Sequence, residues 1–96
     1  NGGTIIVGAG KLGRALLDYG VFADYGLSVM AAFDVKVKDE EISPSGKKIL
    51  PVSELPHFCQ THNIKIGIIA VPPESAQEVC NLLYENGVKA IWCFAP

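Results

Sequence analysis

The fold of this chain is decided by the stretch Thr4-Ile5-Ile6-Val7-Gly8-Ala9-Gly10-Lys11-Leu12-Gly13-Arg14-Ala15-Leu16-Leu17. Four strand-forming residues lead directly into a Gly-x-Gly-x-x-Gly turn, and an apolar pattern of helical spacing follows it. The first glycine of such a turn permits a tight bend, the second lets a pyrophosphate approach the backbone, and the third lets the helix pack on its strand. Unpaired N–H groups at the start of the helix favour an anion. The stretch therefore predicts a cofactor cradle formed by Gly8, Ala9, Gly10, Lys11, Leu12 and Gly13.

An acidic residue, Asp34, ends the next apolar run, Val29–Phe33. It lies about 20 residues beyond Gly13, the spacing expected for a carboxylate that binds the adenosine ribose. A carboxylate accepts hydrogen bonds from ribose hydroxyls and repels a 2′-phosphate, so NAD is favoured over NADP. The alternative is a turn residue that only terminates the strand.

Composition indicates one small domain of 96 residues, with 49% hydrophobic residues, a net charge of −2 and a pI near 5.6. The longest run of basic residues is Lys47-Lys48, so we expect no nucleic-acid-binding face on this chain. No apolar run is long enough to span a membrane, and no signal peptide opens the sequence. Asn1-Gly2-Gly3 resembles the end of a linker, which favours a chain that is part of a longer protein.

The three cysteines show neither a disulfide pattern nor zinc-ligand spacing. Cys59, Cys80 and Cys93 each fall within an apolar pattern, so we expect small buried side chains. This use of cysteine fits a reducing, cytoplasmic location.

Apolar runs alternate with helical patterns, which is typical of parallel βαβ units. The patterns predict strands at Thr4–Val7, Leu27–Phe33, Lys48–Pro51, Lys65–Val71 and Lys89–Phe94, and helices at Lys11–Tyr19, Glu54–Thr61 and Pro73–Asn86. We expect Gly20 to end the first helix, Ser53 to cap the second, and Val35–Lys47 to form a solvated loop. The fold class is therefore α/β, a Rossmann-like doubly wound parallel sheet of about five strands in the order 3-2-1-4-5, with helices on both faces.

Ligands of such sheets bind at the carboxyl edge, where the glycine turn, Asp34 and Val71–Pro73 should meet. Catalytic candidates there are few. His57 and His62 flank the second predicted helix, and Glu74 and Ser75 suit a helix's first turn, so we interpret them as structural. Tyr19 could line the pocket or pack in the core. These patterns favour a binding domain over an enzyme.

Several motifs together strongly resemble the Rex family of bacterial redox-sensing transcriptional repressors. They are Val7–Leu16, Asp18-Tyr19, Ala31–Asp34, Ala70–Gln77 and Phe94–Pro96. The resemblance spans nearly all 96 residues but only the central Rossmann domain of that family. Two positions depart from the family pattern, with Gly20-Val21-Phe22 in place of Pro-Gly-Phe and Cys93 in place of asparagine.

The resemblance implies a homodimeric repressor that senses the NADH/NAD ratio and releases operator DNA when NADH binds. It implies that the three glycines cradle the pyrophosphate, that Asp34 binds the ribose, and that Val71 and Pro72 lie by the nicotinamide, near Tyr19. It further implies a DNA-binding winged helix and a domain-swapped C-terminal helix in the longer protein, and we expect neither within these 96 residues, so that operator DNA is bound through a domain not present here.

Two alternatives stay open. The chain could be the nucleotide-binding half of an NAD-dependent reductase, or a domain that binds CoA or a nucleotide sugar. Both share this type of sheet and its glycine turn.

Overall fold

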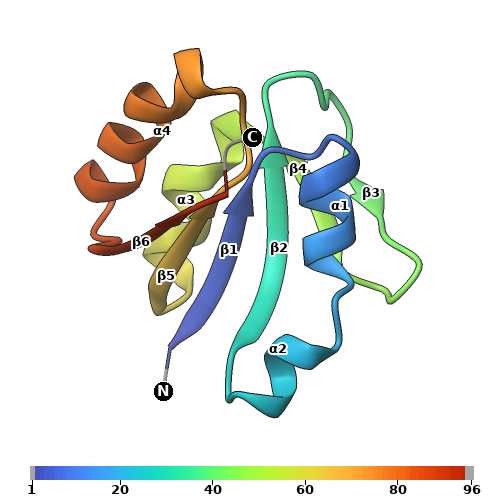
Figure 1. The fold of residues 1–96 in the computed structure, drawn as a ribbon. Coiled ribbons are helices and arrows are strands. Elements are labelled where there is room, and N and C mark those ends of the chain that lie inside the picture. Colours follow the sequence, from blue (N-terminus) through green and yellow to red (C-terminus); the bar gives the residue numbers. More distant parts are fainter. Residues whose placement is uncertain (1, 95–96) are drawn as a thin grey trace.

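The computed structural model describes residues 2–94, so Asn1 and the Ala95-Pro96 part of the Phe94–Pro96 motif lie outside the described residues. A six-stranded sheet runs through the molecule in the order β3-β4-β2-β1-β5-β6 (Figure 1). The strands are β1 (Gly3–Val7), β2 (Ser28–Asp34), β3 (Glu41–Ile42), β4 (Lys48–Pro51), β5 (Ile64–Ile69) and β6 (Ala90–Cys93). All neighbouring pairs are parallel except β3 with β4. The predicted doubly wound sheet and its strand order are confirmed, with one strand added at the edge.

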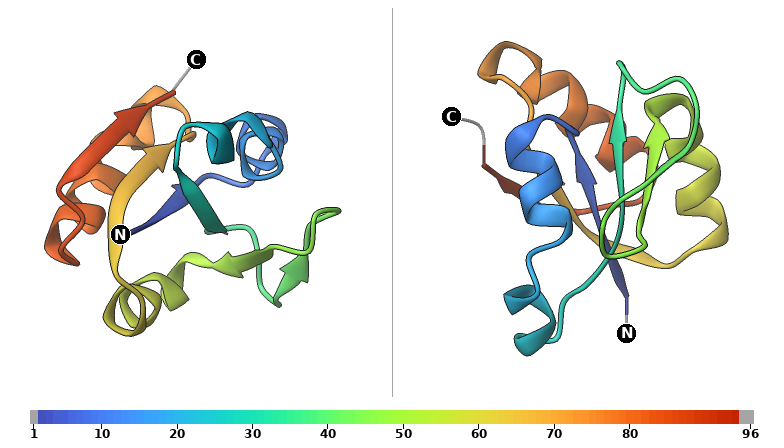
Figure 2. Two further views of the ribbon diagram at one scale, coloured as in Figure 1. Left: turned by 90° about the horizontal axis from the view of Figure 1, so that it is seen from below. Right: turned by 90° about the vertical axis from the view of Figure 1, so that its right-hand side faces the viewer.

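Two layers of helices cover the sheet (Figure 2). They are α1 (Lys11–Leu17), α2 (Val21–Asp24), α3 (Leu55–Thr61) and α4 (Pro73–Glu85), with a 3-10 helix at Val52–Glu54 before α3. Because side chains alternate along a strand, each central strand supplies both cores. Ile5 packs with Leu55 and Leu83 on the α3 and α4 side, whereas Ile6 packs with Leu17 on the α1 side. Burial on both faces explains why these strands are almost wholly apolar.

The segment between β2 and β4 differs from the expected solvated loop. It contains β3, and it buries Val37 and Ser43 to 7% and 6% exposure. The Ser43 hydroxyl donates to Asp18 Oδ1 at 2.8 Å, and Lys47 Nζ donates to the carbonyl oxygen of Leu17 at 3.0 Å. Hydrogen bonds to the end of α1 therefore hold this segment against the helix.

Three local predictions were wrong. The first helix ends at Leu17, and Gly20, which has a φ of −63°, is the N-cap of α2 and does not stop α1. Ser53 lies inside the 3-10 helix, whose turn already directs the chain into α3, so it is not the N-cap. Cys93 is exposed because β6 is an edge strand, while Cys59 and Cys80 are only partly buried. The predicted stop of the last helix at Asn86-Gly87 is confirmed, with Gly87 at a φ of +90°.

Candidate functional site

The glycine turn leaves β1 at the carboxyl edge of the sheet, and its backbone explains two of the three glycines. Gly8 has a φ of +116°, a conformation that L side chains rarely adopt. A Cβ on Gly13 would overlap the carbonyl oxygen of Gly8, so only glycine lets α1 approach the turn this closely. Gly10 differs, because a Cβ there would meet no protein atom within 4 Å. No internal packing requirement therefore accounts for a glycine at position 10.

Asp34 follows Phe33 at the end of β2 and reaches the glycine turn. Its Oδ2 accepts a hydrogen bond from the Ala9 N–H at 2.7 Å, and its Oδ1 accepts one from the Lys36 N–H at 2.9 Å. The backbone N–H of Gly8 also donates to the Phe33 carbonyl at 2.7 Å, which keeps the two strand ends together. The predicted meeting of Asp34 with the glycine turn is confirmed.

A cavity of about 970 Å³ opens at this edge. Of the residues predicted to bind a cofactor, it is lined by Gly8, Ala9, Gly10, Asp34, Val71 and Pro72. Further lining comes from residues that the sequence patterns did not single out as ligand contacts, among them Arg14, Val35, Lys36, Glu41, Val52, Ser75, Glu78 and Val79. The cavity thus joins the turn after β1, the segment after β2 and one face of α4 along its length, from Ser75 to Glu85.

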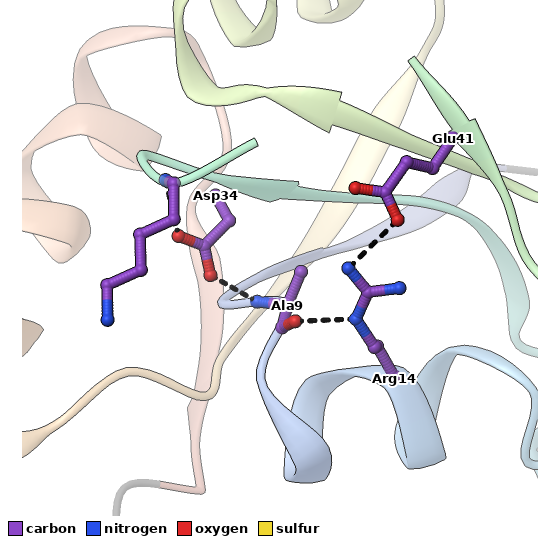
Figure 3. A network of polar contacts seen from close by, with 5 residues as sticks. Ala9, Arg14, Asp34 and Glu41 are labelled. Atoms are coloured by element: carbon purple, nitrogen blue, oxygen red, sulfur yellow. Dashed lines mark hydrogen bonds and ion pairs between the residues drawn. The ribbon is translucent and has the colours of Figure 1, made fainter. Parts of the chain in front are cut away.

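Arg14 and Glu41 form a polar network with the glycine turn (Figure 3). Arg14 Nε donates to the Ala9 carbonyl at 2.8 Å, and Arg14 Nη2 lies 3.1 Å from Glu41 Oε1. Arg14 could have been identified from the sequence as the polar residue that follows Gly13 on the first helix. Glu41 could not, because its position depends on a two-residue strand within a charged segment.

Four predicted cofactor contacts do not line the cavity. Lys11, Leu12 and Gly13 lie in the first turn of α1, next to the turn that does. Tyr19 lies between α1 and α2, is 51% exposed, and packs edge-on against Phe22 at 5.3 Å between ring centroids. Its predicted role near the nicotinamide stays a prediction.

Neither histidine lines the cavity. His62 stacks on Phe58 at 4.0 Å between centroids, beyond the end of α3, and His57 lies within α3. Within residues 2–94, no group of three or more metal-ligating side chains occurs, and no helix is long and apolar enough to cross a membrane.

Three comparisons with known proteins bear on this site. Residues 1–96 match the family described as CoA binding domain. The redox-sensing transcriptional repressor Rex of Clostridium botulinum is 42% identical over 92 residues, which cover 96% of this chain and 44% of the repressor. The chain thus spans less than half the length of this curated relative.

Solved structures agree with the sequence comparison. The crystal structure of RSP, a Rex-family repressor, matches with a TM-score of 0.90 at 32% identity, covering 100% of this chain and 46% of RSP. RSP structures with β-NADH, and with β-NAD+ and operator DNA, both match with a TM-score of 0.89. A UDP-D-quinovosamine 4-dehydrogenase from Vibrio fischeri, at 21% identity and a TM-score of 0.72, covering 94% of this chain and 75% of the enzyme, shares the fold alone. The chain belongs to the CoA binding domain family, and its resemblance to the Rex repressors is confirmed by sequence and by structure.

Proposed function

We propose that this chain is the NAD(H)-binding, redox-sensing domain of a bacterial transcriptional repressor that releases operator DNA when NADH binds. The observation that carries the proposal is the cavity that joins Gly8–Gly10, Asp34 and Val71–Pro72. All of this chain is similar in structure to a part of RSP. RSP itself has been crystallised with β-NADH, and with β-NAD+ and operator DNA.

The residues of the cavity fit a dinucleotide. The open space at Gly10 lets a pyrophosphate come close to the backbone, and Asp34 retains unused lone pairs for ribose hydroxyls. A carboxylate at that position repels a phosphate on the adenosine ribose. It therefore disfavours both NADP, which carries a 2′-phosphate, and CoA, which carries a 3′-phosphate, although the family takes its description from CoA.

Redox sensing needs a difference in affinity between two ligands that share their ADP half. The bound cofactor supplies a nicotinamide ring that is cationic when oxidised and neutral when reduced. Val71 and Pro72 offer that end an apolar wall, which favours the neutral ring because burying a charge is costly. We propose that Tyr19 adds to this discrimination, as the Rex resemblance implies.

We propose binding without catalysis, in the cytoplasm, because the curated relatives are transcriptional repressors. We also propose that residues 1–96 form one dinucleotide-binding domain of a longer homodimeric protein, with a winged helix before it and a domain-swapped helix after it. The coverage of 44% of the Rex relative leaves room for such parts.

Isothermal titration of this chain with NADH, NAD+, NADPH and CoA tests the cofactor. We expect NADH to bind most tightly and NADPH and CoA to bind at least tenfold more weakly. No binding of any dinucleotide at millimolar concentration would refute the cofactor, and preferential binding of CoA would favour the CoA alternative. In the longer protein, NADH should weaken operator binding, and turnover of a substrate with NADH would favour the reductase alternative.

A further inference from the structure

The peptide groups on either side of Ala9 are held by opposite charges. Its N–H donates to Asp34, and its carbonyl accepts from Arg14 Nε (Figure 3). The two hydrogen bonds measure 2.7 and 2.8 Å. The three covalent bonds that lead from the nitrogen of Ala9 to its carbonyl oxygen sum to about 4.2 Å. The guanidinium Nε therefore lies within about 10 Å of the carboxylate predicted to hold the ribose.

An arginine at that distance can reduce the selectivity of the site for NADH over NADPH. In dinucleotide sites, an arginine near the ribose accommodates the 2′-phosphate of NADP, and guanidinium pairs with phosphate through two parallel hydrogen bonds. Arg14 lines the same cavity as Asp34 and is 44% exposed, so it retains N–H groups for such a contact.

Glu41 counters this tendency. Its Oε1 lies 3.1 Å from Arg14 Nη2, and it reaches the cavity from β3, an edge strand that pairs with β4. We propose that Glu41 is a specificity-determining residue, which pairs with Arg14 and so keeps its charge from attracting a 2′-phosphate. The inference rests on the proposed function, because it concerns the same cofactor site, and it adds a second acidic residue to the selectivity of Asp34.

Other charges face the cavity and enter the argument. Lys36 follows Asp34 and is the second basic residue of the lining, while Glu78 and Glu85 contribute negative charge from α4. With Asp34 and Glu41, the acidic lining residues outnumber the basic ones. A variant of Lys36 separates its contribution from that of Arg14.

The test compares Glu41→Gln with the matched control Glu40→Gln. Both remove one negative charge, but Glu40 pairs with Lys48, at 3.8 Å, and does not line the cavity. Affinities for NADH and NADPH are measured by titration of the 96-residue chain, with unfolding midpoints recorded for each variant. We expect Glu41→Gln to raise the NADPH to NADH affinity ratio about 1.4-fold to fivefold, the range for an exposed ion pair, and Glu40→Gln to leave the ratio unchanged.

The double variant Glu41→Gln/Arg14→Gln should lose the gain, whereas Glu41→Gln/Lys36→Gln should keep it. An equal gain in Glu40→Gln, a gain that survives loss of Arg14, or no gain at all would overturn the inference. The same comparison in an Asp34→Ser background keeps NADPH binding measurable. Failure of the unaltered chain to bind either nucleotide would refute the proposed function itself, which is a different result from an unchanged ratio.

Discussion

The glycine turn allows stability and binding to be separated with two substitutions three residues apart. In Gly13→Ala, the new Cβ overlaps the Gly8 carbonyl oxygen, which is backbone and cannot rotate away. In Gly10→Ala, the Cβ points into space that holds no protein atom within 4 Å, and the φ of −80° suits alanine. The first change should therefore displace α1, and the second should only fill the space proposed for the pyrophosphate.

The expected magnitudes differ by a wide margin. Overpacking of a tight site costs about 1–3 kcal/mol, and a backbone clash should reach the upper end, about 3 kcal/mol. For Gly10→Ala, the poorer N-cap costs up to about 1 kcal/mol, and the lower entropy of the unfolded chain offsets about 0.4–1 kcal/mol of it. The net change in the free energy of unfolding should be within about 0.5 kcal/mol.

Urea unfolding and NADH titration on the same preparations provide the assay. With a urea dependence of about 2 kcal/mol per molar, Gly13→Ala should lower the midpoint by about 1.5 M. Gly10→Ala should keep its midpoint and lose at least tenfold in NADH affinity, while Gly20→Ala, at an exposed glycine with nothing within 4 Å, should change neither. Gly10→Ala with unaltered NADH affinity, or with a midpoint as low as that of Gly13→Ala, would refute the reasoning.

Three further changes test single interactions. Asp34→Asn should weaken NADH binding about tenfold or more by titration, because it removes the charged acceptor proposed for the ribose hydroxyls, and it should reduce the ratio of NADH to NADPH affinity. Hydrogen bonds, first of all from Ser45, hold the pKa of Asp18 below its ordinary value of 3.8. Because a lowered pKa stabilises the fold above the ordinary value, the stability difference between the unaltered chain and Asp18→Asn should be full at pH 7. It should shrink as the pH falls below about 3.8 in urea unfolding at several pH values, and a difference independent of pH would contradict this. Thr4→Val should raise the free energy of unfolding by about 1 kcal/mol in urea unfolding, because the Thr4 hydroxyl is buried with no hydrogen-bond partner among residues 2–94. A loss of stability in this variant would show that the hydroxyl has a partner.

Most of the sheet followed from local pattern. Three apolar runs predicted buried strands, and they end before Gly8, Asp34 and Pro72. The helical patterns between these runs predicted crossover helices, which make the strands parallel. Strand limits moved by one or two residues, because the last hydrogen bonds depend on neighbouring strands. The edge strand β3 left no such trace, since two exposed residues pair only because β4 is already in place.

The sequence by itself determined the geometry of the glycine turn and its contact with the end of β2. Gly8, Gly13 and Asp34 are required by backbone sterics and by charge, which act over short distances and are legible in the order of residues. Only the tertiary structure decided which side chains complete the site. It brought Glu41 to Arg14 across 27 positions, buried Ser43 against Asp18, and left Tyr19 outside the cavity. Such contacts join elements packed from different parts of the chain, and no local periodicity encodes the distance between them.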